Sequence, residues 1–293
     1  MQDHQVRTVN VFPGGAGGGN PAPIVLEADG MSAEAMREVA RRAGHESGFV
    51  LVPDPASGAQ FRMRYFVPLH EMEMCGHATV GALWLLRRAG RWTTSATLID
   101  TPSGQVHGRM RHPGTADEYV EISQPEGRLQ LIDDASQIAA IVDVLGVSRD
   151  ALLPLAMLNA ATSRVKTLVG VRAVQALDGL RPDFARMEAL CASIGSTGLY
   201  PFAVESAERR VFHARQFPKS SGYPEDAATG IAAAALLFGL KEYKLVPHDA
   251  EVVTIHQGRA MGKPSEIRVR FNFDAQGRPA GCLLGGRVAE AAH

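Results

Sequence analysis

Two short segments place chemically capable side chains where a helix is expected to begin. Each precedes a long apolar run, and each is rich in residues with little or no side chain. The free N–H groups and the positive dipole end of a helix N-terminus bind anions, and small residues let substrate oxygen atoms approach the backbone closely. The pattern predicts binding of a small, carboxylate-bearing molecule by Cys75, Gly76, His77, Asp226, Ala227, Thr229 and Gly230.

The three reactive side chains of these segments each have a structural alternative. A helix N-terminus favours a reactive thiolate at Cys75, although free cysteines are also among the residues most often buried. His77 is either a core histidine or a hydrogen-bonding partner for substrate. Asp226 is either an ordinary N-cap or a functional carboxylate opposite the Cys-Gly-His segment.

Glu46 is a further acid/base candidate. It lies in GHESGFV, after the glycine that ends an expected helix and before the apolar strand that begins at Phe49. Partial burial raises the pKa of a carboxyl group toward the range useful for proton transfer. Surface glutamates are common at the ends of turns, so spacing alone leaves both readings open.

Several familiar motifs are excluded. HEMEM at His70 lacks the second histidine of a zincin, because Met74 takes its place. His70, Glu73, Cys75 and His77 lack paired zinc-ligand spacing, so no metal is expected. GHESG is not a nucleophile elbow, because its serine is one position late. The glycines at 14–19 lack the lysine of a phosphate-binding loop.

The chain contains an internal repeat. RYFVPLHEMEMCGHATVGALWLL from Arg64 resembles RQFPKSSGYPEDAATGIAAAALL from Arg215, at an offset of 151 residues. The same offset relates Cys75 to Asp226 and Gly44 to Gly195, although the Ala-Thr pair slips by one position. Such self-similarity indicates two related halves.

Each half has the same expected order of elements: a capped helix, strands, and a helix that is apolar all round and therefore buried. The first helices begin after Ser32 and Asp183 and end at Gly44 and Gly195. The expected strands are 49–53, 62–67, 201–204 and 211–217, and the buried helices are roughly 76–89 and 228–240. We therefore predict two related halves, each with a buried helix wrapped by strands. The halves are 1–127, joined by the C-terminal strand at about 279–293, and 128–278, with the two helix starts facing a shared cleft.

Composition narrows the function class. The 293 residues include 45% hydrophobic and 21% charged, and the net charge is −1, so an ordinary core is expected. No basic run is interleaved with aromatics, which argues against nucleic-acid binding. The longest apolar run, 231–240, is about half of the roughly 20 residues of a membrane span. The start resembles no signal peptide, and three scattered cysteines favour a reducing cytoplasm.

The sequence resembles the PhzF-like phenazine-biosynthesis proteins, which have the diaminopimelate-epimerase fold. The resemblance rests on GNPAPIVL from Gly19, HESGFVL from His45, RYFVPLHEMEMCGHATVGA from Arg64, RQFPKSSGYPEDAATG from Arg215 and HQGRAMGKPSEIRV from His256. It implies an α+β fold of two pseudo-symmetric halves, each a curled, mostly antiparallel sheet wrapped round a central buried helix. It further implies a cofactor-independent and metal-independent isomerase that forms a homodimer. It also implies that Glu46 is the catalytic glutamate and that Gly76, His77, Asp226, Gly230 and Asn20 lie around the substrate.

The chain departs from the family pattern at three places. Ala227 replaces a frequent proline and Ile231 a frequent serine, so the phenazine substrate itself is not expected to carry over. Cys75 occupies the place of a catalytic cysteine of diaminopimelate epimerases, but the partner thiol is replaced by Asp226. This argues against a two-thiol mechanism.

The prediction is therefore an isomerase that shifts a proton on a small, carboxylate-bearing molecule through Glu46, with His77 and Asp226 orienting the substrate. One alternative is a racemase, epimerase or dehydratase that uses Cys75 with Glu46 or Asp226. Another is a binding protein that has lost catalysis, for which the missing serine at Ile231 is the argument.

Overall fold

The computed structural model describes residues 5–291 and divides into two compact units. Unit 1 comprises Met1–Pro13, Gly19–Ser123 and Gly285–His293, and unit 2 comprises Gly14–Gly18 and Gln124–Leu284. The units thus change over at Ser123 rather than at residue 127, and the chain returns to unit 1 at Gly285 rather than near residue 279. Unit 2 also takes in the glycine-rich loop.

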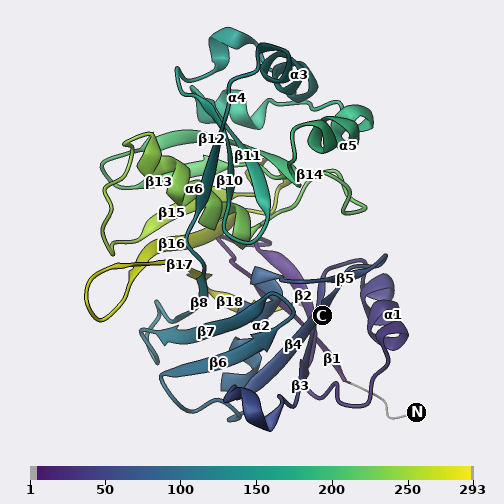
Figure 1. The fold of residues 1–293 in the computed structure, drawn as a ribbon. Helices are drawn as coiled ribbons and strands as arrows, with labels where there is room; N and C mark the ends of the chain where they lie inside the picture. The colour runs from purple at the N-terminus through teal and green to yellow at the C-terminus, as the bar shows by residue number, and fades with distance from the viewer. Residues whose placement is uncertain (1–4, 292–293) are drawn as a thin grey trace. The chain divides into compact units, whose positions relative to one another are not determined.

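Unit 1 is a mostly antiparallel sheet with a helix inside it and a helix outside it (Figure 1). Its strands pair in the order β18–β1–β2–β3–β4–β6–β7–β8, with β2–β3 and β4–β6 parallel and β5 added beside β4. The strands are β1 (Val6–Val11), β2 (Asn20–Val25), β3 (Ser47–Leu51), β4 (Phe61–Phe66), β5 (Glu71–Met72), β6 (Ala96–Thr101), β7 (Gly104–Arg111), β8 (Tyr119–Gln124) and β18 (Val288–Glu290).

Helix α2 (Gly76–Arg88) is the centre of unit 1. Every residue from Gly76 to Leu86 is buried, and the helix packs against β1, β2, β3 and β18. Fully burying a Val or Leu side chain contributes roughly 1.5–3 kcal/mol, so an all-round apolar helix is stable only when strands surround it. On the other side of the sheet, α1 (Ala33–Ala43) covers β3 and β4 through Met36 and Ala40, which pack against Phe49 and Phe66.

Unit 2 repeats this topology. Its strands pair in the order β9–β10–β11–β12–β13–β15–β16, with β11–β12 and β13–β15 parallel, as at the equivalent positions of unit 1, and β14 lies beside β12. The strands are β9 (Arg128–Ile132), β10 (Met157–Ala161), β11 (Val165–Val171), β12 (Gly198–Ser206), β13 (Val211–Ala214), β14 (Phe217–Pro218), β15 (Val253–Gln257), β16 (Ser265–Phe273) and β17 (Pro279–Gly286).

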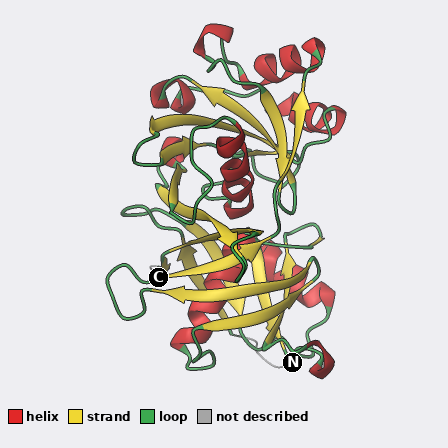
Figure 2. Cartoon of the chain, turned by 60° about the vertical axis from the view of Figure 1, so that its left-hand side comes forward, coloured by secondary structure: helices red, strands yellow, loops and turns green. Residues whose placement is uncertain are grey.

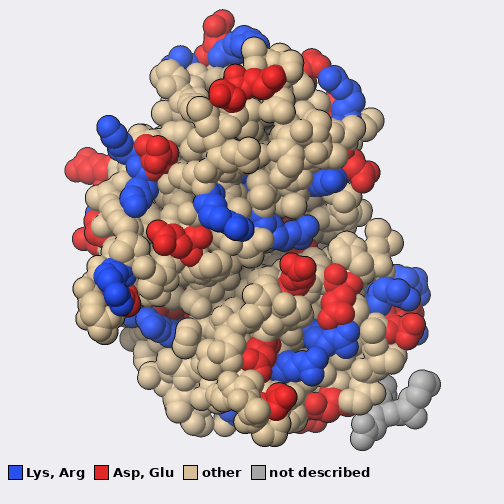
Figure 3. Space-filling model, viewed as in Figure 1, with Lys and Arg blue, Asp and Glu red and all other residues tan. Residues whose placement is uncertain are grey.

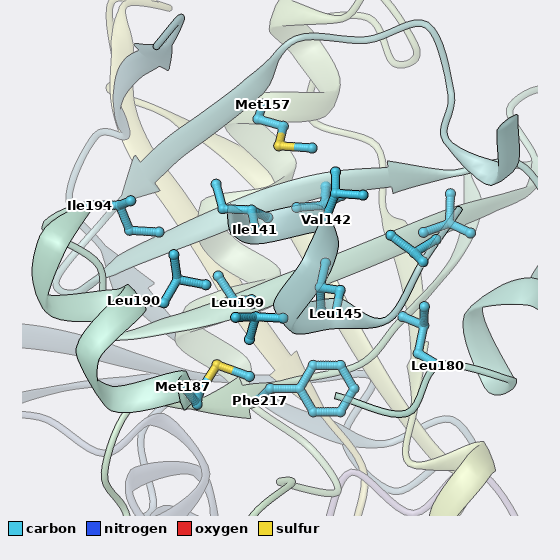
Figure 4. Close-up of a cluster of buried hydrophobic side chains, with 14 of the residues drawn as sticks. Ile141, Val142, Leu145, Met157, Leu180, Met187, Leu190, Ile194, Leu199 and Phe217 are labelled. Carbon is cyan, nitrogen blue, oxygen red and sulfur yellow. The ribbon is translucent and has the colours of Figure 1, made fainter. Parts of the chain in front are cut away.

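The central helix of unit 2 is α6 (Gly230–Glu242), which is buried from Gly230 to Leu240 and packs against β9, β10, β11 and β16. Figure 2 shows a helix surrounded by strands in each unit. The outer face of the sheet carries α3 (Ala135–Leu145), α4 (Val174–Asp178) and α5 (Phe184–Ser193). Their apolar side chains form one core with β12 and β14, in which Leu145, Leu190, Leu199 and Phe217 take part (Figure 4).

The predicted fold class is confirmed, with shifts at the helix ends. The side chains of Ser32 and Asp183 cap α1 and α5 as expected, and Gly44 takes the left-handed conformation after α1. Helix α6 begins at Gly230, two residues later than expected, with Thr229 as its N-cap. The N-cap alternative for Asp226 is therefore wrong, and the loop before α6 is three residues longer than its counterpart before α2.

The loop Gly14–Gly18 needs glycine because it touches other backbone. Gly14 N–H donates to Pro264 O at 2.9 Å, and a Cβ added at Gly18 would lie 1.8 Å from the same oxygen. Gly18→Ala is expected to lower the free energy of unfolding by about 1–3 kcal/mol, the usual cost of overpacking. The measurement is the urea midpoint. Gly15→Ala is the control, because its Cβ would make an ordinary 3.4 Å contact with Pro264, and equal losses in both variants would contradict the explanation.

The surface carries charges of both signs, in keeping with the net charge of −1. On the face shown in Figure 3, basic and acidic side chains are interspersed. Within residues 5–291, no helix is both long enough and apolar enough to span a membrane.

Candidate active site

The start of α2 brings together three of the predicted side chains. Cys75 is the N-cap residue of α2, and its own side chain makes no cap hydrogen bond to the helix. Gly76 and His77 form its first turn. Glu46 directly precedes β3, which runs parallel to β2 and packs against α2. The start of β3 and the start of α2 thus place Glu46 beside Cys75, which is 29 positions later in the chain.

The three side chains are in mutual contact. Cys75 Sγ donates to Glu46 Oε2 at 3.1 Å and lies 3.4 Å from His77 Nδ1, while His77 Nδ1 lies 3.5 Å from Glu46 Oε2. Cys75 and His77 are 2% and 4% exposed, whereas the Glu46 side chain is 15% exposed. Glu46 is therefore the member of the cluster that solvent or a ligand reaches most readily.

A buried hydroxyl pair fixes the backbone of this helix start. Thr79 Oγ1 donates to Cys75 O at 2.7 Å and shares a 2.7 Å hydrogen bond with Tyr65 Oη on β4. Burial raises the pKa of Tyr65, so its phenol stays neutral. The position of the Cys75 thiol is thereby tied to both α2 and β4.

Asn20 is the first residue of β2 and is 7% exposed. Strands β2 and β3 run parallel with Ile24 beside Gly48. Continued toward the amino ends, this register sets Glu46 level with Ala22, two residues along β2 from Asn20.

The start of α6 has its own polar cluster in unit 2. Asp226 accepts a 2.5 Å hydrogen bond from Thr229 Oγ1 and is 9% exposed. It pairs with Gln216 in an isolated bridge, three residues before the helix N-cap. Ala227 is buried, and Gly230 opens the helix.

Gln257 at the end of β15 organises this second cluster. Its Nε2 donates to Asp226 O at 2.7 Å and to Thr229 Oγ1 at 3.2 Å. Its Oε1 accepts from Tyr200 Oη at 2.9 Å and from Thr229 N–H at 3.3 Å. Burial, followed by the Asp226 carboxylate, raises the pKa of Tyr200, so the phenol remains a donor. The side chain of Gln257 therefore links Tyr200, Asp226 and Thr229 at the start of α6.

Sequence reasoning missed Gln257 and a buried ion pair beside it. Arg215 donates two hydrogen bonds to Glu225, at 2.8 and 2.7 Å, and both side chains are largely buried. Glu225 directly precedes Asp226, so the pair anchors the loop that carries this carboxylate. The signal was present in the repeat, because the same offset of 151 residues relates Arg215 to Arg64, which forms the equivalent pair with Glu71.

Comparison with known proteins supports a common origin along nearly the whole chain. Residues 9–291 match the family model described as PhzC-PhzF, phenazine biosynthesis-like protein. The chain is 30% identical over 269 residues to the "Uncharacterized isomerase YddE" of Escherichia coli K12, covering 90% of this chain and 89% of that protein. It is 28% identical to the trans-2,3-dihydro-3-hydroxyanthranilate isomerase of Pseudomonas aeruginosa, covering 91% and 90% of the two chains.

A solved structure agrees at the level of the fold. The Bacillus anthracis phenazine biosynthesis protein of the PhzF family superposes with a TM-score of 0.87 at 24% identity, covering 100% of this chain and 98% of that one. The predicted resemblance is thus confirmed, and the chain belongs to the phenazine biosynthesis-like PhzC-PhzF family.

Proposed function

We propose that this chain is an isomerase that shifts a proton on a small, carboxylate-bearing metabolite, with Glu46 as the acid/base. The observation that supports this most is the contact of Glu46 with Cys75 and His77 at the start of α2. A carboxylate, a thiol and an imidazole next to free backbone N–H groups form an arrangement suited to proton transfer beside a developing negative charge. Its curated relatives are isomerases.

In the proposed reaction, Glu46 removes a proton from a substrate carbon. The electron pair of the broken C–H bond passes into the conjugated system of the substrate. The N–H groups of the first turn of α2 stabilise the resulting negative charge, an effect typically worth 10²–10³-fold in rate for one such donor. The protonated Glu46 then returns the proton to a different carbon on the same face.

The remaining roles follow from the family resemblance and, for Ala227 and Thr229, from their place at the start of the second buried helix. We assign substrate orientation to His77 and Asp226 and substrate binding to Asn20, Gly76, Ala227, Thr229 and Gly230. Ile231, which replaces the frequent serine, lies in the first turn of α6 and is 7% exposed. Without a hydroxyl there, we expect a substrate with one polar substituent fewer at this point than trans-2,3-dihydro-3-hydroxyanthranilate. The homodimer, the cytoplasmic location and the independence from cofactors stay predictions.

A second candidate is epimerisation by two groups, Cys75 and Glu46. The 3.1 Å hydrogen bond from Sγ to Oε2 supports activation of the thiol, because a carboxylate in this position can accept the thiol proton and leave a thiolate base. The two groups would have to separate and lie on opposite faces of the substrate carbon. Such a pair then inverts one stereocentre and leaves the carbon skeleton and its double bonds unchanged.

The two candidates differ in the product formed in deuterated water. The protein is incubated with trans-2,3-dihydro-3-hydroxyanthranilate and with a series of small hydroxy and amino acids. In at least one of these compounds we expect loss of a proton from one carbon and gain of a proton or deuteron at another. Nuclear magnetic resonance of the products locates the new C–H or C–D bond. Deuterium found only at the original stereocentre, with inversion, would contradict the proton shift and support epimerisation.

A further inference from the structure

The cluster Glu46–Cys75–His77 also has the dimensions of a metal site. Cys75 Sγ lies 3.1 Å from Glu46 Oε2 and 3.4 Å from His77 Nδ1, and these last two atoms are 3.5 Å apart. One donor atom from each residue thus lies within 4.8 Å of the others. A tetrahedral zinc ion with bonds of about 2.0–2.3 Å holds its ligand atoms about 3.3–3.6 Å apart. An ion can therefore contact all three atoms after shifts of a few tenths of an ångström.

The donor set is typical of thiophilic divalent cations. A thiolate, an imidazole nitrogen and a carboxylate oxygen suit Zn²⁺ and Cd²⁺ better than Mg²⁺ or Ca²⁺, which prefer oxygen. The thiolate and carboxylate together carry two negative charges, which match one divalent ion. The positive end of α2 opposes a cation only weakly compared with a metal–thiolate bond. Three protein ligands leave a fourth position for water or a carboxylate of the substrate.

We propose that Glu46, Cys75 and His77 bind one Zn²⁺ or Cd²⁺ ion per chain and that this ion inhibits the enzyme. On binding, the bond from sulfur to the metal replaces the Cys75 S–H bond, and the proton passes to solvent. Glu46 and His77 each donate a lone pair to the ion. The carboxylate that would take the substrate proton is then occupied, so metal and proton transfer exclude each other. The inhibition rests on the proposed function, whereas the binding does not.

Cadmium titration tests the binding, because a Cd²⁺–thiolate bond adds an ultraviolet charge-transfer band. We expect the full chain to gain this band at one equivalent. Cys75→Ala should lose the band and weaken Cd²⁺ binding by roughly 100-fold or more, beyond the effect of outer-shell partners. Cys282→Ala is the matched control and should keep both the charge-transfer band and the wild-type affinity for Cd²⁺. Burial raises the pKa of Cys282, and raises that of Cys191 to about 11, so both stay protonated thiols.

The binding proposal is overturned if the band persists in Cys75→Ala, or if wild-type protein gains no band at a large excess of Cd²⁺. Circular dichroism confirms that each variant is folded, and Glu46→Gln, which keeps the thiol, provides a second test. It should retain the band but bind Cd²⁺ more weakly, and undiminished affinity would remove Glu46 from the site.

Zinc chloride tests the inhibition. Zn²⁺ should abolish turnover of any substrate found in deuterated water at one equivalent per chain, and a chelator should restore it. If Cd²⁺ binds through Cys75 but Cd²⁺ at the same concentration leaves turnover intact, the metal site stands and the role of Glu46 in the reaction fails. If turnover depends on Glu46 but no metal binds, the proposed function stands and the metal site fails.

Discussion

Glu46→Gln is expected to lower kcat by roughly 10²–10⁴-fold, the usual contribution of a positioned acid/base. Glutamine keeps the size of the side chain and can still accept the hydrogen bond from Cys75 Sγ. It has no basic oxygen for a substrate proton, so binding should persist while chemistry fails. The measurement is steady-state kinetics, in which KM should change far less than kcat.

Glu73→Gln is the matched control for this substitution. Glu73 is an exposed glutamate two positions before Cys75, so the same chemical change is made close to the site and outside the cluster. We expect wild-type kcat from Glu73→Gln and wild-type circular dichroism from both variants. A Glu46→Gln variant that turns substrate over at the wild-type rate would remove Glu46 from the mechanism.

Arg215→Met is expected to lower the free energy of unfolding by about 3–5 kcal/mol, the usual cost of breaking a buried ion pair. The Arg215 side chain is 8% exposed and that of Glu225 is 11% exposed. Nη1 of Arg215 also donates to the carbonyl oxygens of Leu177, Asp178 and Leu180, at 3.0, 3.1 and 3.0 Å. Methionine fills part of the volume but leaves a carboxylate and three carbonyl groups without this donor.

The internal repeat supplies the control for Arg215→Met. Arg64 forms the equivalent bidentate pair with Glu71, at 2.7 Å for both bonds, but these side chains are 22% and 37% exposed. Arg64→Met should therefore cost no more than about 1 kcal/mol. Denaturant unfolding of the two variants measures the difference, and equal losses would show that burial does not set the cost.

The repeat made the fold predictable to a large extent. Polar caps and glycine stops mark α1 and α5, and the apolar runs mark α2 and α6 as buried helices, because these signals are local in the sequence. The order of strands in each sheet is set by pairings between distant segments, such as β18 with β1, and no local pattern encodes these pairings.

The site was predictable in part. Cys75 and His77 are neighbours in the chain, so their proximity followed from the helix start. Glu46 was an ambiguous turn glutamate until the family resemblance was considered, because its contact with Cys75 depends on how β3 packs against α2. Asp226 was placed at the wrong point of its helix, since the longer loop shifts the start of α6 to Gly230. Gln257 was not predicted, because a glutamine at a strand end that forms hydrogen bonds with backbone groups produces no periodic pattern in the sequence.

The division of the chain also orders the steps of synthesis. Unit 2 is nearly continuous in sequence and has all of its strands once Leu284 has been made. Unit 1, which contains Glu46, Cys75 and His77, receives β18, a partner of β1, only after unit 2 has been translated. A ribosome-bound nascent chain is therefore expected to present an unpaired β1 edge during translation of unit 2, and exposed strand edges promote aggregation. Translation rate and chaperone supply are expected to affect the yield of folded protein through this edge.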